Sequence, residues 1–147
     1  MTLWVELERS RLVTSEAFTL TWNEWWQVAG ALGIEDEGDA AASYRPRFNI
    51  APTDQHFIVT SEFERRRVQR ARWGLVNRSA TDNRRASQCI NAKAETLEQR
   101  GTFREAFRER RCVVPADGFY EWTGPKGKRQ PLWIHPRAGD LMLFAGL

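Results

Sequence analysis

The sequence predicts an α+β fold in which antiparallel sheets form a barrel-like core with two or three flanking helices. The first observation is a series of short segments that alternate or run apolar and are rich in β-branched residues, as strands are. The second is that two segments carry apolar residues at helical spacing. The third is the length of 147 residues, which suits one domain with a core of its own. Many short strands with few helices are typical of α+β proteins.

The first clear element is a helix. Residues 1–14 are interpreted as an N-terminal extension and assigned to neither helix nor strand. Thr21 and Glu24 have capping-box spacing, which predicts a helix that starts near Trp22. Gly33 is a plausible C-cap. The expected buried stripe is Trp25, Val28, Ala29 and Leu32.

The middle of the chain predicts an extended segment and a hairpin. Residues 35–43 are acidic and small, which indicates a loop. Residues 44–53 contain two prolines and predict an ordered, extended surface segment. Residues 56–60 and 67–76 read as two strands joined by 61–66.

The last third predicts a helix followed by strands. Residues 77–88 are polar and rich in turn formers, so we expect a loop. Thr102 and Glu105 form a second capping box, with Phe103, Ala106 and Phe107 on the buried side. Further predicted features are a strand at 112–114, a turn at 115–118, a hairpin loop at 123–129 and strands at 131–135 and 141–145.

The charge is unevenly distributed. The net charge is +3, but residues 64–111 hold 14 Lys and Arg against 6 Asp and Glu. A basic segment in a nearly neutral chain suggests a surface that faces a polyanion. The alternative is a solvated arginine-rich face without a partner.

Composition argues against several protein classes. With two Cys, two His and no C-x-x-C, we expect no metal site, and we expect no other cofactor. No apolar run reaches membrane-span length and no secretory signal is evident. Free thiols fit a reducing compartment, so a cytoplasmic location is expected.

Two residue types invite a catalytic reading. Glu121 lies between Tyr120 and Trp122 in a predicted buried strand, where a carboxylate tends to have a raised pKa that suits acid/base chemistry. The alternative is that it faces solvent. Cys112 with His135 would suggest a thiol protease, but the apolar run around Cys112 favours a buried, inert thiol.

Four ordered stretches resemble one family. They are RFNIAPT at 47–53, RWGLV at 72–76, NAKAET at 91–96 and RRCVVPADGFYEW at 110–122. Together they resemble the SOS-response-associated peptidases, the abasic-site DNA–protein crosslinking proteins. The resemblance implies a domain over 15–147, apparently truncated at its C-terminus, with the α+β fold expected above.

The resemblance implies a covalent chemistry. In the family, an N-terminal Cys condenses with the aldehyde of an abasic site in single-stranded DNA and closes to a thiazolidine; the same Cys is linked to self-processing peptidase activity. Ser15 aligns with that Cys, and Thr2 is a second conceivable amine. By resemblance, Asn91 orients the N-terminal residue and Glu121 is the general acid/base. The family His would lie beyond Leu147, and His135 does not match it.

The resemblance also implies a DNA interface. We expect Arg45 and Arg47 to contact phosphates and Pro52 to wedge against bases, and the remaining DNA-binding candidates are Arg70, Arg72, Trp73 and Lys93. The expected partner is single-stranded DNA with abasic sites, bound by a monomer. Two alternatives stay open: a catalytically degenerate module that only binds single-stranded DNA, and a fragment that folds poorly.

Overall fold

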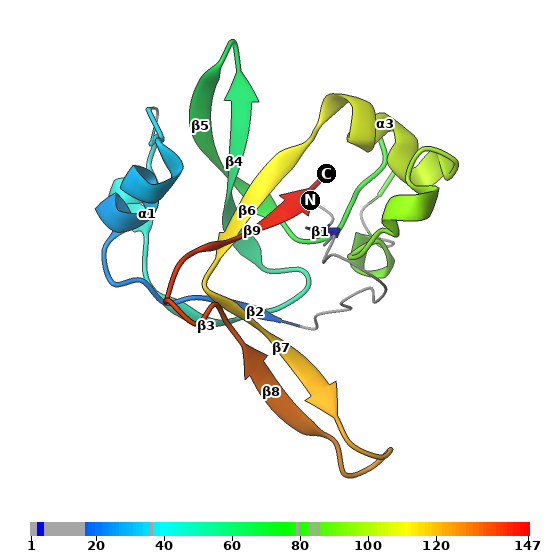
Figure 1. The fold of residues 1–147 in the computed structure, drawn as a ribbon. Coiled ribbons are helices and arrows are strands. Elements are labelled where there is room, and N and C mark those ends of the chain that lie inside the picture. The colour runs from blue at the N-terminus through cyan, green and yellow to red at the C-terminus, as the bar shows by residue number, and fades with distance from the viewer. Residues whose placement is uncertain (1–2, 5–16, 36, 79, 83, 85) are drawn as a thin grey trace.

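Two antiparallel sheets and three α-helices make up the described part of the chain (Figure 1). The computed structural model describes residues 3–4, 17–35, 37–78, 80–82, 84 and 86–147. In order across the first sheet, the strands are β1 (Leu3–Trp4), β9 (Met142–Gly146), β6 (Cys112–Ala116), β4 (Gln55–Glu62) and β5 (Arg65–Arg72). In the second sheet they are β3 (Arg47–Ile50), β2 (Phe18–Leu20), β7 (Gly118–Thr123) and β8 (Gln130–Ile134). The helices are α1 (Trp25–Leu32), α2 (Ala40–Ser43) and α3 (Gly101–Glu109).

The α+β class is confirmed, but the barrel-like core is wrong. Among the described strands, neither sheet closes: β1 and β5 end the first sheet, and β3 and β8 end the second. The reason lies at Asp117, where the chain leaves β6 in one sheet and enters β7 in the other. The two sheets therefore pack on each other as open layers. Phe144 of β9 meets Phe18 of β2 and Phe119 of β7 at ring-centroid distances of 5.9 Å each.

Helix α1 confirms the predicted stripe and end but not the predicted start. Its four stripe residues are buried, and Gly33 ends the helix with φ of 56°. The capping box is formed by Glu24 and Gln27 instead of Thr21 and Glu24. Thr21 is unavailable as a cap because its hydroxyl and its amide both donate to Asp117.

Other elements differ from the expectations at their boundaries. Strand β4 is longer than predicted and β5 starts earlier, since only Phe63 and Glu64 form the turn, both with positive φ; β5 also ends earlier, at Arg72. The expected loop 35–43 contains α2. Helix α3 starts at Gly101 with Arg100 as N-cap, so Thr102 is inside it; Phe103 and Ala106 are buried as expected.

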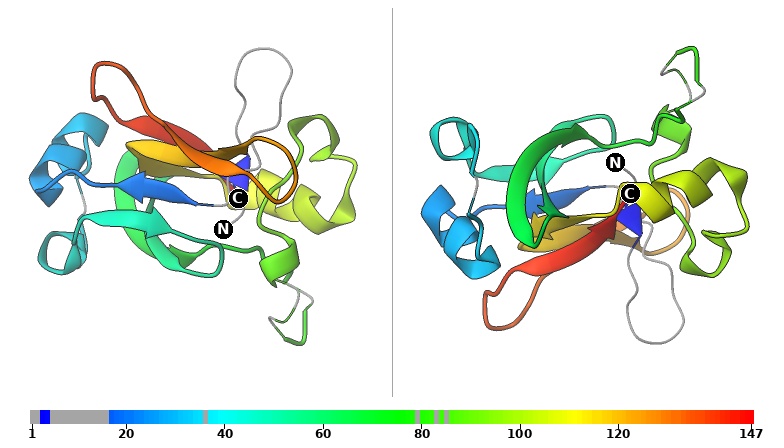
Figure 2. Two further views of the ribbon diagram at one scale, coloured as in Figure 1. Left: turned by 90° about the horizontal axis from the view of Figure 1, so that it is seen from below. Right: turned by 90° about the horizontal axis from the view of Figure 1, so that it is seen from above.

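The helices lie at opposite ends of the molecule. Figures 1 and 2 show α1 and α2 together at one end and α3 at the other, with the sheets between them. The β7–β8 hairpin projects away from the body (Figure 1). Two residues of the expected N-terminal extension, Leu3 and Trp4, pair with Gly146 and Ala145 of β9. None of the described helices has the length and apolar character needed to cross a membrane.

Candidate functional site

The site is organised by the buried carboxylate of Asp117. Its Oδ1 accepts from the Thr19 hydroxyl at 2.5 Å, and its Oδ2 accepts from the Thr21 hydroxyl at 2.6 Å and from the Thr21 amide. The amide of Asp117 donates in turn to the Thr19 carbonyl at 2.9 Å. A buried carboxylate with this many donors is well satisfied. These bonds fix β2 against the bend that starts β7.

Strand β7 places Glu121 beside the residues that lead into β2. Phe18 pairs with Phe119, and the Tyr120 amide donates to the Ala17 carbonyl at 3.0 Å. Side chains alternate along a strand, so Glu121 is on the same side as the buried Phe119. Glu121 is half-buried, which favours the interior reading over a solvent-facing carboxylate. Ser15 lies outside the described residues, two positions before Ala17.

Asn91 is held by a different set of contacts around the same aromatic cluster. The indole Nε1 of Trp73 donates to the Ile90 carbonyl at 2.8 Å, and Ala92 is buried. The Trp73 ring packs on Phe18 with centroids 5.3 Å apart. Asn91 is half-buried and follows Ile90, which is hydrogen-bonded to Trp73. Glu121 lies two residues after Phe119, which pairs with Phe18. Neither side chain lines the larger cavities found among the described residues.

The segment expected to carry Pro52 is a locked turn. The Arg47 guanidinium pairs with Asp54 at 2.6 Å and donates to the Gln55 carbonyl at 2.9 Å. Thr53 has φ of 78°, in a region that non-glycine residues rarely occupy, and its amide donates to the Trp73 carbonyl. Pro52 is thus held half-buried at a rigid position next to Trp73.

The structure brings together three of the predicted DNA-binding arginines. Arg45, Arg47 and Arg70 line one cavity of about 140 Å³ between the 43–47 segment and β4–β5. Arg70 is positioned by a salt bridge to Asp39 at 3.6 Å, and its guanidinium lies 5.2 Å from the centroid of the Phe57 ring. Fixed guanidinium groups lose less side-chain freedom when they bind a phosphate.

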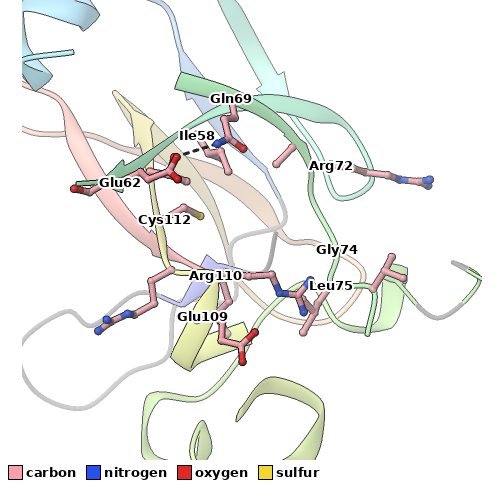
Figure 3. A pocket seen from close by; sticks show the side chains of 15 residues that line it. Ile58, Glu62, Gln69, Arg72, Gly74, Leu75, Glu109, Arg110 and Cys112 are labelled. Atoms are coloured by element: carbon pink, nitrogen blue, oxygen red, sulfur yellow. Dashed lines mark hydrogen bonds between the residues drawn. The ribbon is translucent and has the colours of Figure 1, made fainter. Parts of the chain in front are cut away.

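Arg72 does not join that group. It lines a separate cavity of about 620 Å³, together with Glu109, Arg110 and Cys112 near the end of α3 (Figure 3). Strand alternation puts Arg70 and Arg72 on one side of β5, but the two arginines line different cavities.

Trp73 and Lys93 have opposite environments. The Trp73 side chain is fully buried, so it is a core residue and presents no ring to a DNA base. Its place in the site is structural, through the bonds to Ile90 and Thr53. Lys93 is exposed at the start of the 3₁₀ turn Ala94–Thr96, where its amine is accessible to a phosphate.

The buried titratable groups are structural. Burial lowers the pKa of His56 to about 4, outweighing the opposite effect of its hydrogen bond to the Pro115 carbonyl, while the nearby Arg47 charge lowers it further. Burial raises the pKa of Cys112 to about 11, so its thiol stays protonated, as expected for an inert core thiol. His135, which the thiol-protease alternative would pair with Cys112, is exposed and stacks on Trp133.

Two structurally important carboxylates, those of Asp117 and Asp54, were not predicted from the sequence. Each is an acidic residue beside a proline-containing turn. Each accepts hydrogen bonds from residues that no local sequence pattern connects to it. The one available signal was the Thr19-x-Thr21 spacing, which puts two hydroxyls on one side of a strand and calls for a buried acceptor.

Comparison with known proteins settles the family. A family model described as SOS response associated peptidase (SRAP) matches residues 13–147. The chain belongs to this family. Among curated SRAP relatives, abasic site processing protein YobE of Bacillus subtilis is 38% identical over 106 residues, covering 71% of this chain and 48% of YobE. Abasic site processing protein HMCES of Xenopus tropicalis is 27% identical over 111 residues, covering 67% of this chain and 33% of that protein. The chain thus spans less than half the length of these SRAP relatives.

Two solved structures share the fold of this chain. A crystal structure of a protein from Bacteroides thetaiotaomicron superposes with a TM-score of 0.73 at 20% identity, covering 88% of this chain and 58% of that one. A protein from Bordetella bronchiseptica gives a TM-score of 0.68 at 20% identity, covering 88% and 61%. At 20% identity, these two structures show a shared fold and carry no statement about function.

Proposed function

We propose that this chain is an abasic-site processing protein: it binds single-stranded DNA and links covalently to the sugar aldehyde of an abasic site. Family membership and the printed function of its curated relatives support the class of substrate. The free thiol of Cys112 supports action in a reducing cytoplasm. We further propose that the protein acts as a monomer.

One observation carries the proposal, namely the pairing of β2 with β7. The Tyr120 amide donates a hydrogen bond to the Ala17 carbonyl, which holds Ala17 beside β7. The covalent chain then limits the Cα of position 15 to within about 7 Å of the Cα of Ala17. Glu121 is the next residue after Tyr120. A reacting group at position 15 and the carboxyl of Glu121 are thereby candidates for the same reaction.

The chemistry needs an amine, an acid and a positioning group. Hydrolysis of the Thr14–Ser15 peptide bond, which is the self-processing step, frees an α-amine at position 15. This α-amine attacks the aldehyde carbon and forms a carbinolamine. Glu121 as an acid protonates the hydroxyl, which leaves as water, and the nitrogen lone pair completes the imine. Asn91 is assigned the role of orienting the amine. A cysteine placed at position 15 then adds its thiol to the imine carbon to give a thiazolidine; the Ser15 hydroxyl would give the weaker oxazolidine.

The DNA backbone is assigned to the arginine cavity. Arg45, Arg47 and Arg70 converge there, and exposed Lys93 is a further cation for a phosphate. Pro52, on its rigid turn, is assigned the wedge next to the lesion.

The test compares three proteins with one DNA. These are the full chain, a shortened chain that begins at Ser15, and the shortened chain with Ser15→Cys. Each is incubated with a single-stranded oligonucleotide that carries one abasic site and with its undamaged copy. The shortened chain with Ser15→Cys is expected to give a heat-stable adduct without reductant. The shortened chain that keeps Ser15 is expected to give one only after borohydride reduction. No adduct from any of the three, with or without borohydride, would overturn the proposed function.

A second candidate is a module that binds single-stranded DNA without reacting. The converging arginines favour it independently, since their geometry does not require position 15. It predicts salt-sensitive binding of damaged and undamaged strands alike, with no covalent product.

A further inference from the structure

The projecting β7–β8 hairpin has an aromatic outer surface. Tyr120 pairs with Trp133, and Trp122 pairs with Pro131, so these side chains share one face of the hairpin. The other face contains Phe119, which is buried in the core, together with Leu132 and Ile134, which are 51% and 40% exposed. Trp122 is 44% exposed and Trp133 is 46% exposed. Two large rings on the outer side of one ribbon are more apolar surface than the fold requires there.

The Trp133 ring is held in place before any partner arrives. Its Nε1 donates to the Thr19 hydroxyl at 3.1 Å. It lies so close to Gly118 that a Cβ at that position would be 2.2 Å from Nε1. The His135 ring stacks on it with centroids 4.1 Å apart and planes inclined by 21°. A fixed, partly exposed ring loses little freedom when another ring stacks on it.

The same segment is purely cationic. Residues 122–139 contain Lys126, Lys128, Arg129 and Arg137 and no Asp or Glu. The first three are exposed in the turn at the hairpin tip, between the strands that carry Trp122 and Trp133. Cations beside exposed rings are the combination that binds single-stranded nucleic acid, because the rings stack on bases and the cations meet phosphates.

We propose that the outer face of the β7–β8 hairpin is a second contact surface for single-stranded DNA, which holds undamaged nucleotides that flank the reacting one. The class of partner rests on the proposed function. The surface itself is separate from the arginine cavity, because no residue of the β7–β8 hairpin lines that cavity. None of its residues belongs to the basic segment 64–111 from which the sequence predicted DNA binding.

The test measures binding of an undamaged, fluorescently labelled thymidine oligonucleotide by anisotropy over a range of salt concentrations. Trp122→Ala is the main variant, because Trp122 lies near the exposed end of the hairpin and its loss leaves the core intact. Loss of one stacked base is expected to weaken binding about tenfold. Replacing Lys126, Lys128 and Arg129 with Ala is expected to lower the slope of log affinity against log salt by about 2. The matched control is Trp26→Ala on α1, which removes a ring that is 70% exposed and should leave affinity within about twofold.

Several outcomes would overturn this proposal. Unchanged affinity in both hairpin variants would do so, as would an equal loss in Trp26→Ala. Intact DNA affinity with reduced self-association of Trp122→Ala in sedimentation would identify the face as a protein interface instead. Failure of the proposed covalent function is distinguishable, because then no variant forms an adduct with abasic DNA while undamaged DNA still binds through Trp122.

Discussion

A single buried carboxylate, that of Asp117, joins β2 to the bend between the two sheets. Asp117→Ala removes the acceptor for the Thr19 hydroxyl and for the hydroxyl and amide of Thr21. Buried donors that lose their acceptor cost about 1–3 kcal/mol each, with partial recovery by water. We expect the free energy of unfolding to fall by about 2–4 kcal/mol in urea denaturation.

The matched control for this prediction is Asp140→Ala, an exposed acidic residue in the turn before β9. It should change the free energy of unfolding by less than about 0.5 kcal/mol. A similar small effect for Asp117→Ala would mean that β2 is held mainly by its apolar side chains.

Buried His56 makes the free energy of unfolding depend on pH. Its pKa is lowered to about 4 in the folded chain, chiefly by burial, against an ordinary value of 6.5. Below pH 6.5 the unfolded chain therefore binds a proton that the folded chain does not, and stability is lost progressively until the pH reaches about 4. At about 1.4 kcal/mol per pKa unit the total is roughly 3 kcal/mol.

The measurement is urea denaturation of the parent and of His56→Gln between about pH 4 and pH 7, the window set by the two pKa values of His56. The variant is expected to lose less stability than the parent on acidification through this window. Parallel pH profiles for the two proteins would contradict a buried neutral His56. His135 is present in both and serves as an internal reference.

At the scale of elements, helix α1 offers two glycines with opposite requirements. Gly30 is in the helix interior with open space around its Cβ position, whereas Gly33 ends the helix with φ of 56°. Gly30→Ala should raise the free energy of unfolding by about 0.5–1 kcal/mol, because alanine is the better helix former. Gly33→Ala should lower it by about 1 kcal/mol, because a Cβ is strained there.

Thermal denaturation of the two variants checks this pair. Since both replace glycine with alanine in or at the end of one helix, a shift of the melting temperature in the same direction for both would contradict the assigned conformations.

Elements were predictable where a pattern is local. The stripe of α1 and its Gly33 end follow from spacing within one helix, and the strands around Asp117 follow from short apolar runs. The start of α1 was wrong because Thr21 is bonded to a residue 96 positions away. Trp73 was assigned to DNA from the family resemblance, although its ring belongs to the core.

At the scale of the whole molecule, the arrangement of sheets decides what the candidate site can contain. The sequence predicted that Asn91 and Glu121 matter, and the fold attaches both to the cluster of Phe18, Trp73 and Phe119. The sequence could not predict that the sheets stay open or that Arg72 and Arg70 line different cavities. Those features depend on strand twist and on contacts between distant segments.

The central claim is that Glu121 serves the reaction of a group at position 15 with an abasic site. Its most direct test is the rate of adduct formation by the shortened chain with Ser15→Cys, with and without Glu121→Gln, on the same abasic oligonucleotide. The Glu121 replacement is expected to slow adduct formation by about 10²-fold or more while affinity for undamaged DNA changes little. Glu98→Gln, an exposed site away from β7, is the control and should react at the parent rate. Equal rates for Glu121→Gln and the parent would contradict the account.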